Sequence, residues 1–451
     1  MSNERSGFSS RIGFVLATAG SAVGLGNIWR FPYLAAKYGG GSFLLVYLIL
    51  TVTFGFTLMI TEVALGRKSG TSAINAFGYF NKKYSFIGYL TSFIPFIIFP
   101  YYCVIGGWVT KFLLVSIKGQ THAAASDTFF TGFISQPAEP MICLLVFLAI
   151  TTIVVLLGVK GGIERVSTFM MPILVLLLVG ISLFCITRPG AMEGVAYYLK
   201  PSIKHLGPTT FLAALGQLFY SMSLAMGIMI TFGSYMPKKS DLEKSVSQVE
   251  IFDTGIAFLA GLMIVPSVFV FSNGDPSMLA KGPSLMFVML PKVFDSMAFG
   301  NILAAVFFIL VFFAALTSAI SLLETLVAVI MDKFHIKRVT ACILMFIIAC
   351  LMAIPSSFGF GIWSHITIMG FSFLDFFDFL SNSVLMPIAA FLTCIFVAYI
   401  IKPDVIINEV ESSGEFKRKS LFLVMIKYLA PICIIAILVF SIMEGLGLIT
   451  V

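Results

Sequence analysis

Two polar side chains, Asn27 and Arg30, interrupt an otherwise apolar stretch at about residues 11–36. Such groups are costly inside a membrane, so they usually mark a binding site or an ion path. Three glycines within residues 20–26 precede them, and each weakens a helix interior by about 1 kcal/mol. A helix broken here frees backbone carbonyl and N–H groups to bind ions. A glycine-rich packing face is the alternative, but it does not explain Asn27, Arg30 and Pro32 together.

The composition indicates that this stretch is one of many membrane spans. The chain has 451 residues, of which 59% are hydrophobic and 11% charged, whereas soluble domains average about 25% charged residues. The net charge of +7 therefore bears on orientation in the bilayer, and we expect no nucleic acid partner. The seven cysteines and four histidines show no metal-ligand spacing.

We expect an all-α polytopic membrane protein with eleven transmembrane helices. The spans are placed at about residues 11–36, 41–66, 86–117, 141–158, 165–187, 209–236, 247–272, 299–332, 339–355, 366–400 and 421–447. Most Lys and Arg residues fall in the connections on the side of the N-terminus. The positive-inside rule therefore places the N-terminus in the cytoplasm and the C-terminus outside. The polar N-terminus lacks the pattern of a cleaved leader.

The sixth span contains a second candidate break, at Gly216-Gln217 and then across Tyr220–Gly227, where Ser221 and Ser223 compete for backbone hydrogen bonds. Each break lies in the first span of a set of five spans. Because five is odd, the second set is inverted relative to the first, which is typical of inverted-repeat secondary transporters. The expected organisation is a cytoplasmic N-terminus (1–10), a first repeat (11–187), an external loop (188–208), a second repeat (209–400) with an external hairpin (273–298), a plain cytoplasmic connection (401–420) and an eleventh span (421–451).

The stretch RIGFVLATAGSAVGLGNIWRFPYLAAKYGGGSFLLVY resembles the first span of the neurotransmitter:sodium symporter family. The motifs GQLFYSMSLAMG, FFAALTSAISLLETLVAVIMDKF and FLDFFDFL follow in the order typical of that family. Eleven spans resemble its bacterial members that carry hydrophobic or aromatic amino acids. The resemblance implies a leucine-transporter-like 5+5 inverted repeat with helices 1 and 6 unwound, and sodium-coupled transport.

The resemblance also implies two sodium sites. One would use the carbonyls of Gly20, Val23 and Ala314 with the hydroxyls of Thr317 and Ser318. From the residues alone, ordinary bonding of these hydroxyls back to their own helix is an equal alternative. The other site would use the Ala22 carbonyl, the Asn27 amide and Ser221, with the carboxylate of the transported amino acid as a further ligand.

Asp253 lies in the apolar seventh span and allows two interpretations. It is either a carboxylate at the cytoplasmic end, like Glu250, or a fixed charge beside the second sodium. The family carries an Asn ligand of sodium at this position, close to a chloride site in the animal members. A carboxylate there could balance charge in place of chloride, so we expect chloride-independent transport. The register leaves open whether Asp253 bonds to the ion directly.

For the amino acid itself, the resemblance implies three groups of contacts. The carboxylate would meet the N–H groups of Leu25 and Gly26 and the Tyr102 hydroxyl, with Tyr101 as a competing candidate. The ammonium would meet carbonyls of Ala22, Tyr220 and Ser221 and the Ser223 hydroxyl. The side chain would contact Ile98, Met226, Ala319 and Leu322. Gly24 stands where carriers of biogenic amines have a carboxylate, which favours an apolar or aromatic amino acid.

Two gates would alternate. Arg30 and Asp378 would pair on the outer side, above Tyr102 and Tyr220, because both charges lie deep in apolar sequence. Arg5 and Asp332 would pair on the inner side, supported by Ser234, Tyr235 and Phe8, although solvated loop charges are the alternative from sequence alone.

We therefore expect a sodium-coupled symporter for a hydrophobic or aromatic L-amino acid (tyrosine, tryptophan, phenylalanine or leucine type) in a bacterial-type inner membrane. Its expected partners are the amino acid, sodium ions and the lipid bilayer. A non-transporting amino-acid sensor of the same fold is the first alternative, and a channel is the second. An enzyme is the weakest alternative, because the spans show no nucleophile–base pair or metal cluster.

Overall fold

The computed structural model describes residues 7–271 and 283–445, and every regular element in these two ranges is a helix. Within them, nine uninterrupted segments are long and apolar enough to cross a membrane. These are Gly41–Ser69 (α3 and α4), Lys82–Ile117 (α6), Glu139–Leu156 (α9), Val159–Ile186 (α10), Leu242–Phe271 (α14), Gly300–Phe334 (α16), Arg338–Phe358 (α17), Phe373–Ile400 (α18 and α19) and Lys419–Gly445 (α21 and α22). Each lies within a few residues of a predicted span.

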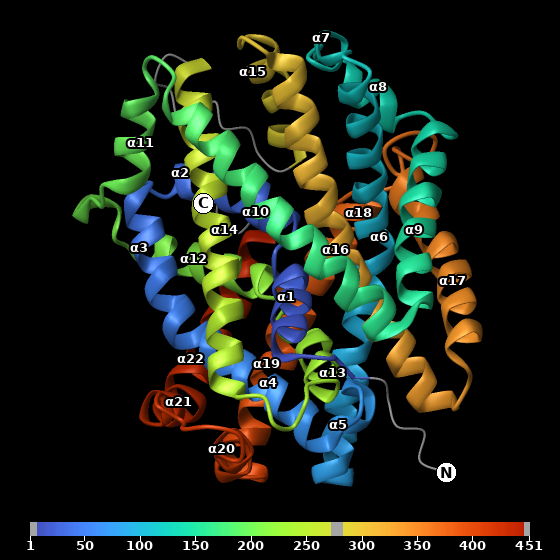
Figure 1. Ribbon diagram of the computed structural model, residues 1–451, viewed down its shortest axis with the longest axis vertical. Coiled ribbons are helices and arrows are strands. Elements are labelled where there is room, and N and C mark those ends of the chain that lie inside the picture. Colours follow the sequence, from blue (N-terminus) through green and yellow to red (C-terminus); the bar gives the residue numbers. More distant parts are fainter. Residues whose placement is uncertain (1–6, 272–282, 446–451) are drawn as a thin grey trace.

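The remaining two predicted spans are broken. The first consists of α1 (Arg11–Ala22), followed by the π-helical turn η1 (Gly26–Arg30) and α2 (Phe31–Lys37), and it bends by 56° at the break. The second contains α12 (Pro208–Ser221) and α13 (Ile228–Ser234), which are 14 and 7 residues long and each too short to cross alone. The total of eleven spans therefore stays a prediction. Helix α1 lies in the middle of the bundle and packs against α10, α14 and α16 (Figure 1).

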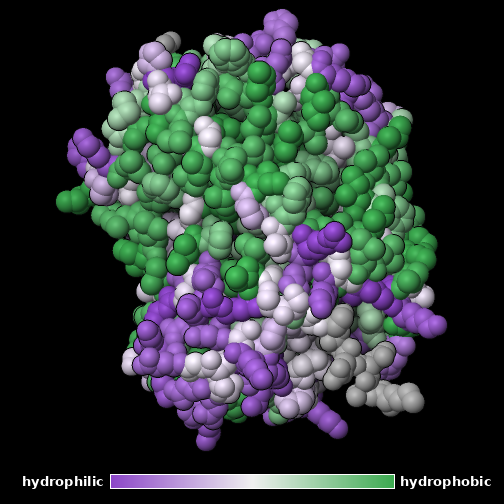
Figure 2. All heavy atoms as spheres, viewed as in Figure 1, coloured by the Kyte–Doolittle hydropathy of each residue, from purple (hydrophilic) through white to green (hydrophobic). Residues whose placement is uncertain are grey.

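The surface of the bundle is apolar where a bilayer would surround it. Figure 2 shows a broad hydrophobic region, with hydrophilic residues gathered at the end where α5 (Ala73–Phe80) and α20 (Asp404–Glu411) lie. Leu176 and Ile251 are 71% and 70% exposed. Large exposed apolar areas are rare on soluble monomers, so this surface indicates a multi-pass membrane protein.

Short helices cover the opposite end of the bundle. They are α7 (Thr121–Ala124), α8 (Phe129–Ile134), α11 (Ala191–Leu199) and α15 (Leu290–Asp295) (Figure 1). Residues 273–282 of the predicted external hairpin lie outside the described residues. In the remaining part, the Phe287 ring packs edge-on against Trp29 and Trp108, with ring centres 6.4 and 5.9 Å apart. This segment therefore packs onto the part of the first broken helix that follows the break, and onto α6.

The connection 401–420 is more ordered than the plain loop expected from its polar sequence. Helix α20 buries Ile406, Ile407 and Val410 against the bundle. Its Glu409 carboxylate accepts a hydrogen bond from the buried Arg67 guanidinium of α4 at 2.8 Å. The connection is therefore packed onto one end of the spans, because its apolar residues share one face of a helix.

Candidate binding site between the two broken helices

The break in the first helix exposes backbone carbonyls toward α16. Helix α1 ends at Ala22, and Val23 is already extended, with φ −74° and ψ 102°. The Ser318 hydroxyl of α16 lies 3.1 Å from the carbonyl oxygens of Ser21 and Val23 and 3.4 Å from that of Gly20. These oxygens converge at one point, which is the arrangement that a dehydrated monovalent cation requires.

The break in the sixth span is held by left-handed backbone. Ser223, Ala225 and Gly227 have φ values of 52°, 61° and 73°, which L-residues other than glycine rarely adopt. The Glu62 carboxylate of α4 accepts a hydrogen bond from the Ala225 N–H at 2.7 Å. The Ser223 hydroxyl donates to the Ser21 carbonyl at 3.0 Å, so the two breaks contact each other.

Gly216 and Gln217, which the sequence places at the candidate break of the sixth span, lie inside α12 and before the break. The Gln217 amide instead donates a hydrogen bond to the Gly26 carbonyl at 3.0 Å. Gln217 therefore satisfies a backbone group that the first break leaves free.

The structure places four of the five residues of the first predicted sodium site around the contact between α1 and Ser318. These are Gly20, Val23, Thr317 and Ser318, with Ala314 one turn before Ser318 on α16. The Thr317 hydroxyl donates back to Phe313 and Ala314 carbonyls at 3.0 and 3.2 Å. Ser318 reaches across to the broken helix, whereas Thr317 makes the back-bonds that were its alternative. The donor set is neutral oxygen, which suits sodium.

Asp253 lies between the two broken helices, not at the end of its span. Its carboxylate accepts hydrogen bonds from the Asn27 amide at 2.7 Å and the Ser221 hydroxyl at 2.9 Å. The Tyr47 hydroxyl donates to its second oxygen at 3.3 Å. Glu250, by contrast, forms an ion pair with Arg418 at 3.2 Å.

No basic side chain balances the charge of Asp253. Among the described residues, no Lys, Arg or His nitrogen lies within 4 Å of its carboxylate. Asp253 is fully buried, and a buried carboxylate needs a counter-charge or must become neutral. Asn27 turns its nitrogen to Asp253, so its oxygen faces the break, where it accepts the Gly24 N–H at 3.2 Å. A sodium ion beside this oxygen and Asp253 would supply the missing charge.

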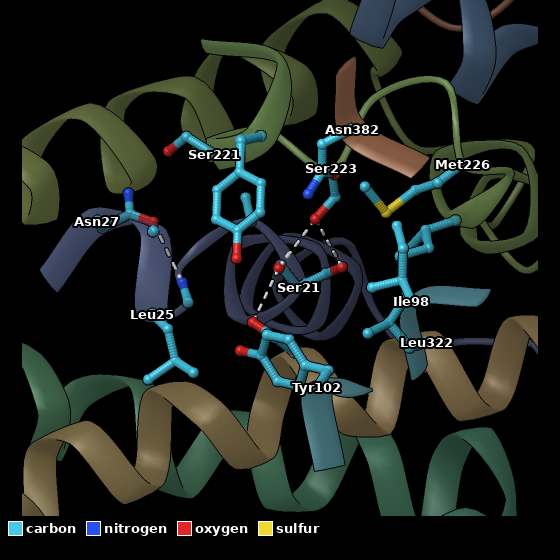
Figure 3. Close-up of a pocket in the computed structure, with 16 residues that line it drawn as sticks. Ser21, Leu25, Asn27, Ile98, Tyr102, Ser221, Ser223, Met226, Leu322 and Asn382 are labelled. Carbon is cyan, nitrogen blue, oxygen red and sulfur yellow. Dashed lines mark hydrogen bonds between the residues drawn. The ribbon is translucent and has the colours of Figure 1, made fainter. Parts of the chain in front are cut away.

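A cavity of about 40 Å³ lies between the breaks (Figure 3). Ten of the eleven predicted substrate residues line it: Ala22, Leu25, Gly26, Ile98, Tyr102, Tyr220, Ser221, Ser223, Met226 and Leu322. Ala319 does not line it. Six further residues do: Ser21, Gly24, Asn27, Ile228, Ser318 and Asn382. Asn382 and Tyr47, which bonds to Asp253, were missed because nothing in their local sequence marks them.

The structure distinguishes the two tyrosines that the sequence left open. The Tyr102 hydroxyl is buried at the cavity, and none of the described residues forms a hydrogen bond with it. The Tyr101 hydroxyl donates instead to Asp378 at 3.1 Å. Tyr102 is therefore the group that can donate to a ligand carboxylate.

Gly26, just after the first break, lies against the ring of Tyr220 in α12, which gives a first prediction. A Cβ added there would lie 2.5 Å from two ring carbons of Tyr220. We expect Gly26→Ala to displace this ring and weaken ligand binding at least tenfold. Equilibrium binding to the purified protein tests this, with Gly216→Ala as the control, because its added Cβ meets nothing within 4 Å. Equal binding by both variants would contradict the prediction.

The outer-gate residues line one larger cavity of about 260 Å³ without touching. Arg30 and Asp378 both face it, yet no ion pair within 4 Å joins these two described side chains. The Arg30 guanidinium lies 5.1 Å from the centre of the Tyr220 ring. Asp378 is held by Tyr101 and by Asn382, whose amide lies 2.6 Å away. Direct pairing of Arg30 with Asp378 stays a prediction.

On the inner side, Asp332 accepts hydrogen bonds from Ser72, at 2.8 Å from its N–H and 2.5 Å from its hydroxyl. Its predicted partner Arg5 lies outside the described residues. The Tyr235 hydroxyl donates to Glu324 at 2.8 Å, and the Arg338 guanidinium also binds that buried carboxylate.

Phe8 packs against the rings of Phe14, Phe232 and Tyr235, with ring centres 5.6 to 6.2 Å apart. Its N–H also bonds to the Tyr235 carbonyl at 3.0 Å. These contacts join the start of α1 to the end of α13.

Comparison with known proteins identifies the family. A model of the Sodium:neurotransmitter symporter family matches residues 5–132 and 126–447. An uncharacterized sodium-dependent transporter of Bacillus subtilis, YhdH, is 36% identical over 440 residues, covering 95% of this chain and 96% of its own. The human sodium- and chloride-dependent GABA transporter 2 is 26% identical over 382 residues, covering 74% of this chain and 63% of its own.

A solved structure agrees with these relatives. The crystal structure of MhsT in complex with L-phenylalanine matches this fold with a TM-score of 0.88 and 38% identity, over 97% of this chain and 100% of that one. The two broken helices and the oxygen-lined space between them are therefore parts of a leucine-transporter-like fold. The chain is a multi-pass sodium-dependent secondary transporter rather than an enzyme, and it belongs to the sodium:neurotransmitter symporter family.

Proposed function

We propose that this protein carries a hydrophobic or aromatic L-amino acid into the cell together with two sodium ions, without chloride. The observation that carries the proposal is the buried Asp253 carboxylate, which contacts Asn27 and Ser221 at the cavity. One sodium would lie at Asn27, Ala22, Ser221 and Asp253, and the other at Gly20, Val23, Ala314, Thr317 and Ser318. Because the amino acid's carboxylate would share the first ion, binding of each would strengthen binding of the other.

The lining of the cavity supports an amino acid with an apolar side chain. Ile98, Met226 and Leu322 form its apolar side, whereas the breaks supply carbonyl and N–H groups for the ammonium and carboxylate. Gly24 stands where carriers of biogenic amines have a carboxylate, and its lack of one argues against an amine as the transported molecule. The cavity is small for a ring, so a bulky cargo requires Met226 to move, and methionine is flexible enough to do so. MhsT binds L-phenylalanine in its solved complex.

The proposed orientation has the N-terminus in the cytoplasm of a bacterial-type cell and the C-terminus outside. The distribution of Lys and Arg residues supports it, because cytoplasmic connections are rich in these residues. With the cell interior negative, each entering sodium charge gains about 2.3 kcal/mol per 100 mV. Two ions would therefore drive inward accumulation, with the gates on the two sides opening in turn.

Equilibrium binding of labelled tyrosine, tryptophan and leucine to the purified protein, in sodium and in choline, tests the proposal. We expect saturable binding that needs sodium and is lost in Asn27→Ala. Uptake into proteoliposomes under a sodium gradient then separates a symporter from a sensor of the same fold, which would bind without transporting. Binding that ignores sodium would contradict the coupled mechanism.

Chloride independence is a separate prediction. Because Asp253 already provides a fixed negative charge beside the proposed sodium, we expect uptake to be unchanged when gluconate replaces chloride. Sodium-driven uptake into proteoliposomes in the two salts measures this. A collapse of uptake in gluconate would show that Asp253 does not replace chloride as the balancing negative charge.

A further inference from the structure

We propose that Asn382 accepts a hydrogen bond from the side chain of the transported amino acid. The site would therefore favour an aromatic amino acid with a hydrogen-bond donor on its ring, such as tyrosine or tryptophan. This inference rests on the proposed function and narrows its substrate class. It depends on one residue of the cavity lining, Asn382, whose side-chain oxygen is buried and without a hydrogen-bond partner among the described residues.

Asn382 reaches the cavity from a distant span through an irregular turn. It lies in the π-helical stretch η8 (Phe379–Leu385) of the tenth predicted span. Such turns occur often at functional sites, because the extra residue redirects side chains. Figure 3 shows Asn382 beside Ser223, on the same side as Met226 and away from Leu25. It therefore lies toward the apolar part of the cavity.

The neighbours of Asn382 fix the orientation of its amide. The nitrogen lies 2.6 Å from the Asp378 carboxylate and 3.3 Å from the Tyr101 hydroxyl. An ionised carboxylate only accepts hydrogen bonds, so the amide must turn its nitrogen to Asp378. The amide oxygen then points away from Asp378, and no residue in the described part of the chain donates to it. A buried acceptor left unpaired costs about 1–3 kcal/mol.

The other polar side chains that line the cavity already have partners or another role. The Ser221 hydroxyl donates to Asp253 and the Ser223 hydroxyl to Ser21. The Ser318 hydroxyl lies 3.1 Å from the Val23 carbonyl. The Tyr102 hydroxyl, which is also unpaired, is assigned to the cargo's carboxylate. The Tyr220 ring packs against Gly26, whose N–H is assigned to the cargo's carboxylate. Among the other side chains described around this cavity, the Asn382 oxygen is thus the acceptor left for a donor on the cargo's side chain.

A ring hydroxyl or indole N–H would complete this hydrogen bond, whereas phenylalanine or leucine would leave the oxygen unpaired. Sites that hydrogen-bond a hydroxyl discriminate strongly against the analogue that lacks it. One such bond corresponds to a preference of about tenfold. We therefore expect tyrosine to bind about tenfold more tightly than phenylalanine, from which it differs only by the hydroxyl.

The test is displacement of labelled phenylalanine from the purified full chain in sodium by tyrosine, tryptophan and unlabelled phenylalanine. Asn382→Leu keeps a similar shape but removes the acceptor. We expect it to weaken tyrosine and tryptophan about tenfold and to leave phenylalanine unchanged. Tyr101→Phe is the matched control, because it removes a hydroxyl from the same network but keeps the Asn382 oxygen, so the tyrosine preference should persist.

Several outcomes would overturn the inference. If the unaltered protein binds phenylalanine as tightly as tyrosine, the inference fails without any variant. If Asn382→Leu weakens all three amino acids equally, Asn382 only positions Asp378. In both cases sodium-dependent binding remains, and the proposed function stands. Failure of the proposed function appears differently, as the absence of sodium-dependent binding to the unaltered chain, and it would overturn both.

Discussion

Replacing Asp253 by asparagine is expected to weaken sodium binding about a hundredfold. The change keeps the shape of the side chain but removes the buried negative charge that contacts Asn27 and Ser221. A hydrogen bond or ion contact to a charged group contributes about 1.5–3 kcal/mol, and each 1.4 kcal/mol is a factor of ten in affinity. Amino-acid binding should fall with it, because the sodium site and the cavity share Asn27, Ala22 and Ser221.

The measurement is the sodium concentration that gives half-maximal amino-acid binding in chloride-free buffer. Tyr47→Phe is the control, because it removes the weakest hydrogen bond to Asp253, at 3.3 Å, and leaves the charge. We expect this control to shift the half-maximal concentration by less than about threefold, since an exchanged neutral hydrogen bond is worth roughly 1 kcal/mol or less. An unchanged sodium requirement in Asp253→Asn would remove Asp253 from the ion site.

A second variant, Asp253→Ala, tests how the charge acts. It would leave the Asn27 amide and the Ser221 and Tyr47 hydroxyls facing the vacated space. Three converging donors can hold a small anion, so added chloride should restore part of the sodium affinity in this variant. If chloride has no effect there, Asp253 acts as a direct ligand of sodium rather than as a replaceable charge.

The two helix breaks differ in how far the sequence could predict them. In the first span, glycines followed by Asn27 mark a break that the structure places directly after Ala22. In the sixth, Ser223 and Ala225 adopt left-handed backbone although their residue types disfavour it. That conformation depends on the Glu62 carboxylate of another span, which holds the Ala225 N–H. No pattern of neighbouring residues contains this information.

The residues of the site also differ in how far the sequence could predict them. Ser318 was identified as half of an adjacent hydroxyl pair, but only the packing of α16 on α1 shows that Ser318, not Thr317, reaches the first break. Asn382 and Tyr47 were not predicted, because each meets its partner across spans that are far apart in sequence. The connection 401–420 did carry a usable signal, since Ile406, Ile407 and Val410 have helical spacing.

That connection carries the largest stability effect we expect. The Arg67 side chain is fully buried and Glu409 is 5% exposed, and their side chains meet at 2.8 Å. The Arg67 guanidinium also donates to the Ser240 carbonyl at 2.9 Å and the Ser413 hydroxyl at 3.0 Å. Removing one partner of a buried pair leaves an uncompensated charge, which costs about 3–5 kcal/mol. Glu409→Leu should therefore lower the midpoint of thermal unfolding of the detergent-purified protein markedly.

The other partner and a nearby exposed pair give the controls. The double variant Arg67→Met with Glu409→Leu should recover most of the lost stability, because replacing both charges by apolar groups avoids the unpaired cation.

Glu411, on the same helix, pairs with Lys419 at 2.9 Å, but both are over 40% exposed. Glu411→Gln should change stability by less than about 1 kcal/mol. If Glu409→Leu were as mild as Glu411→Gln, the Arg67–Glu409 pair would not be what fixes α20 to the spans. A large loss that the double variant does not repair would instead assign the stability to the lysines near Glu409, Lys68 at 3.5 Å and Lys238 at 3.6 Å.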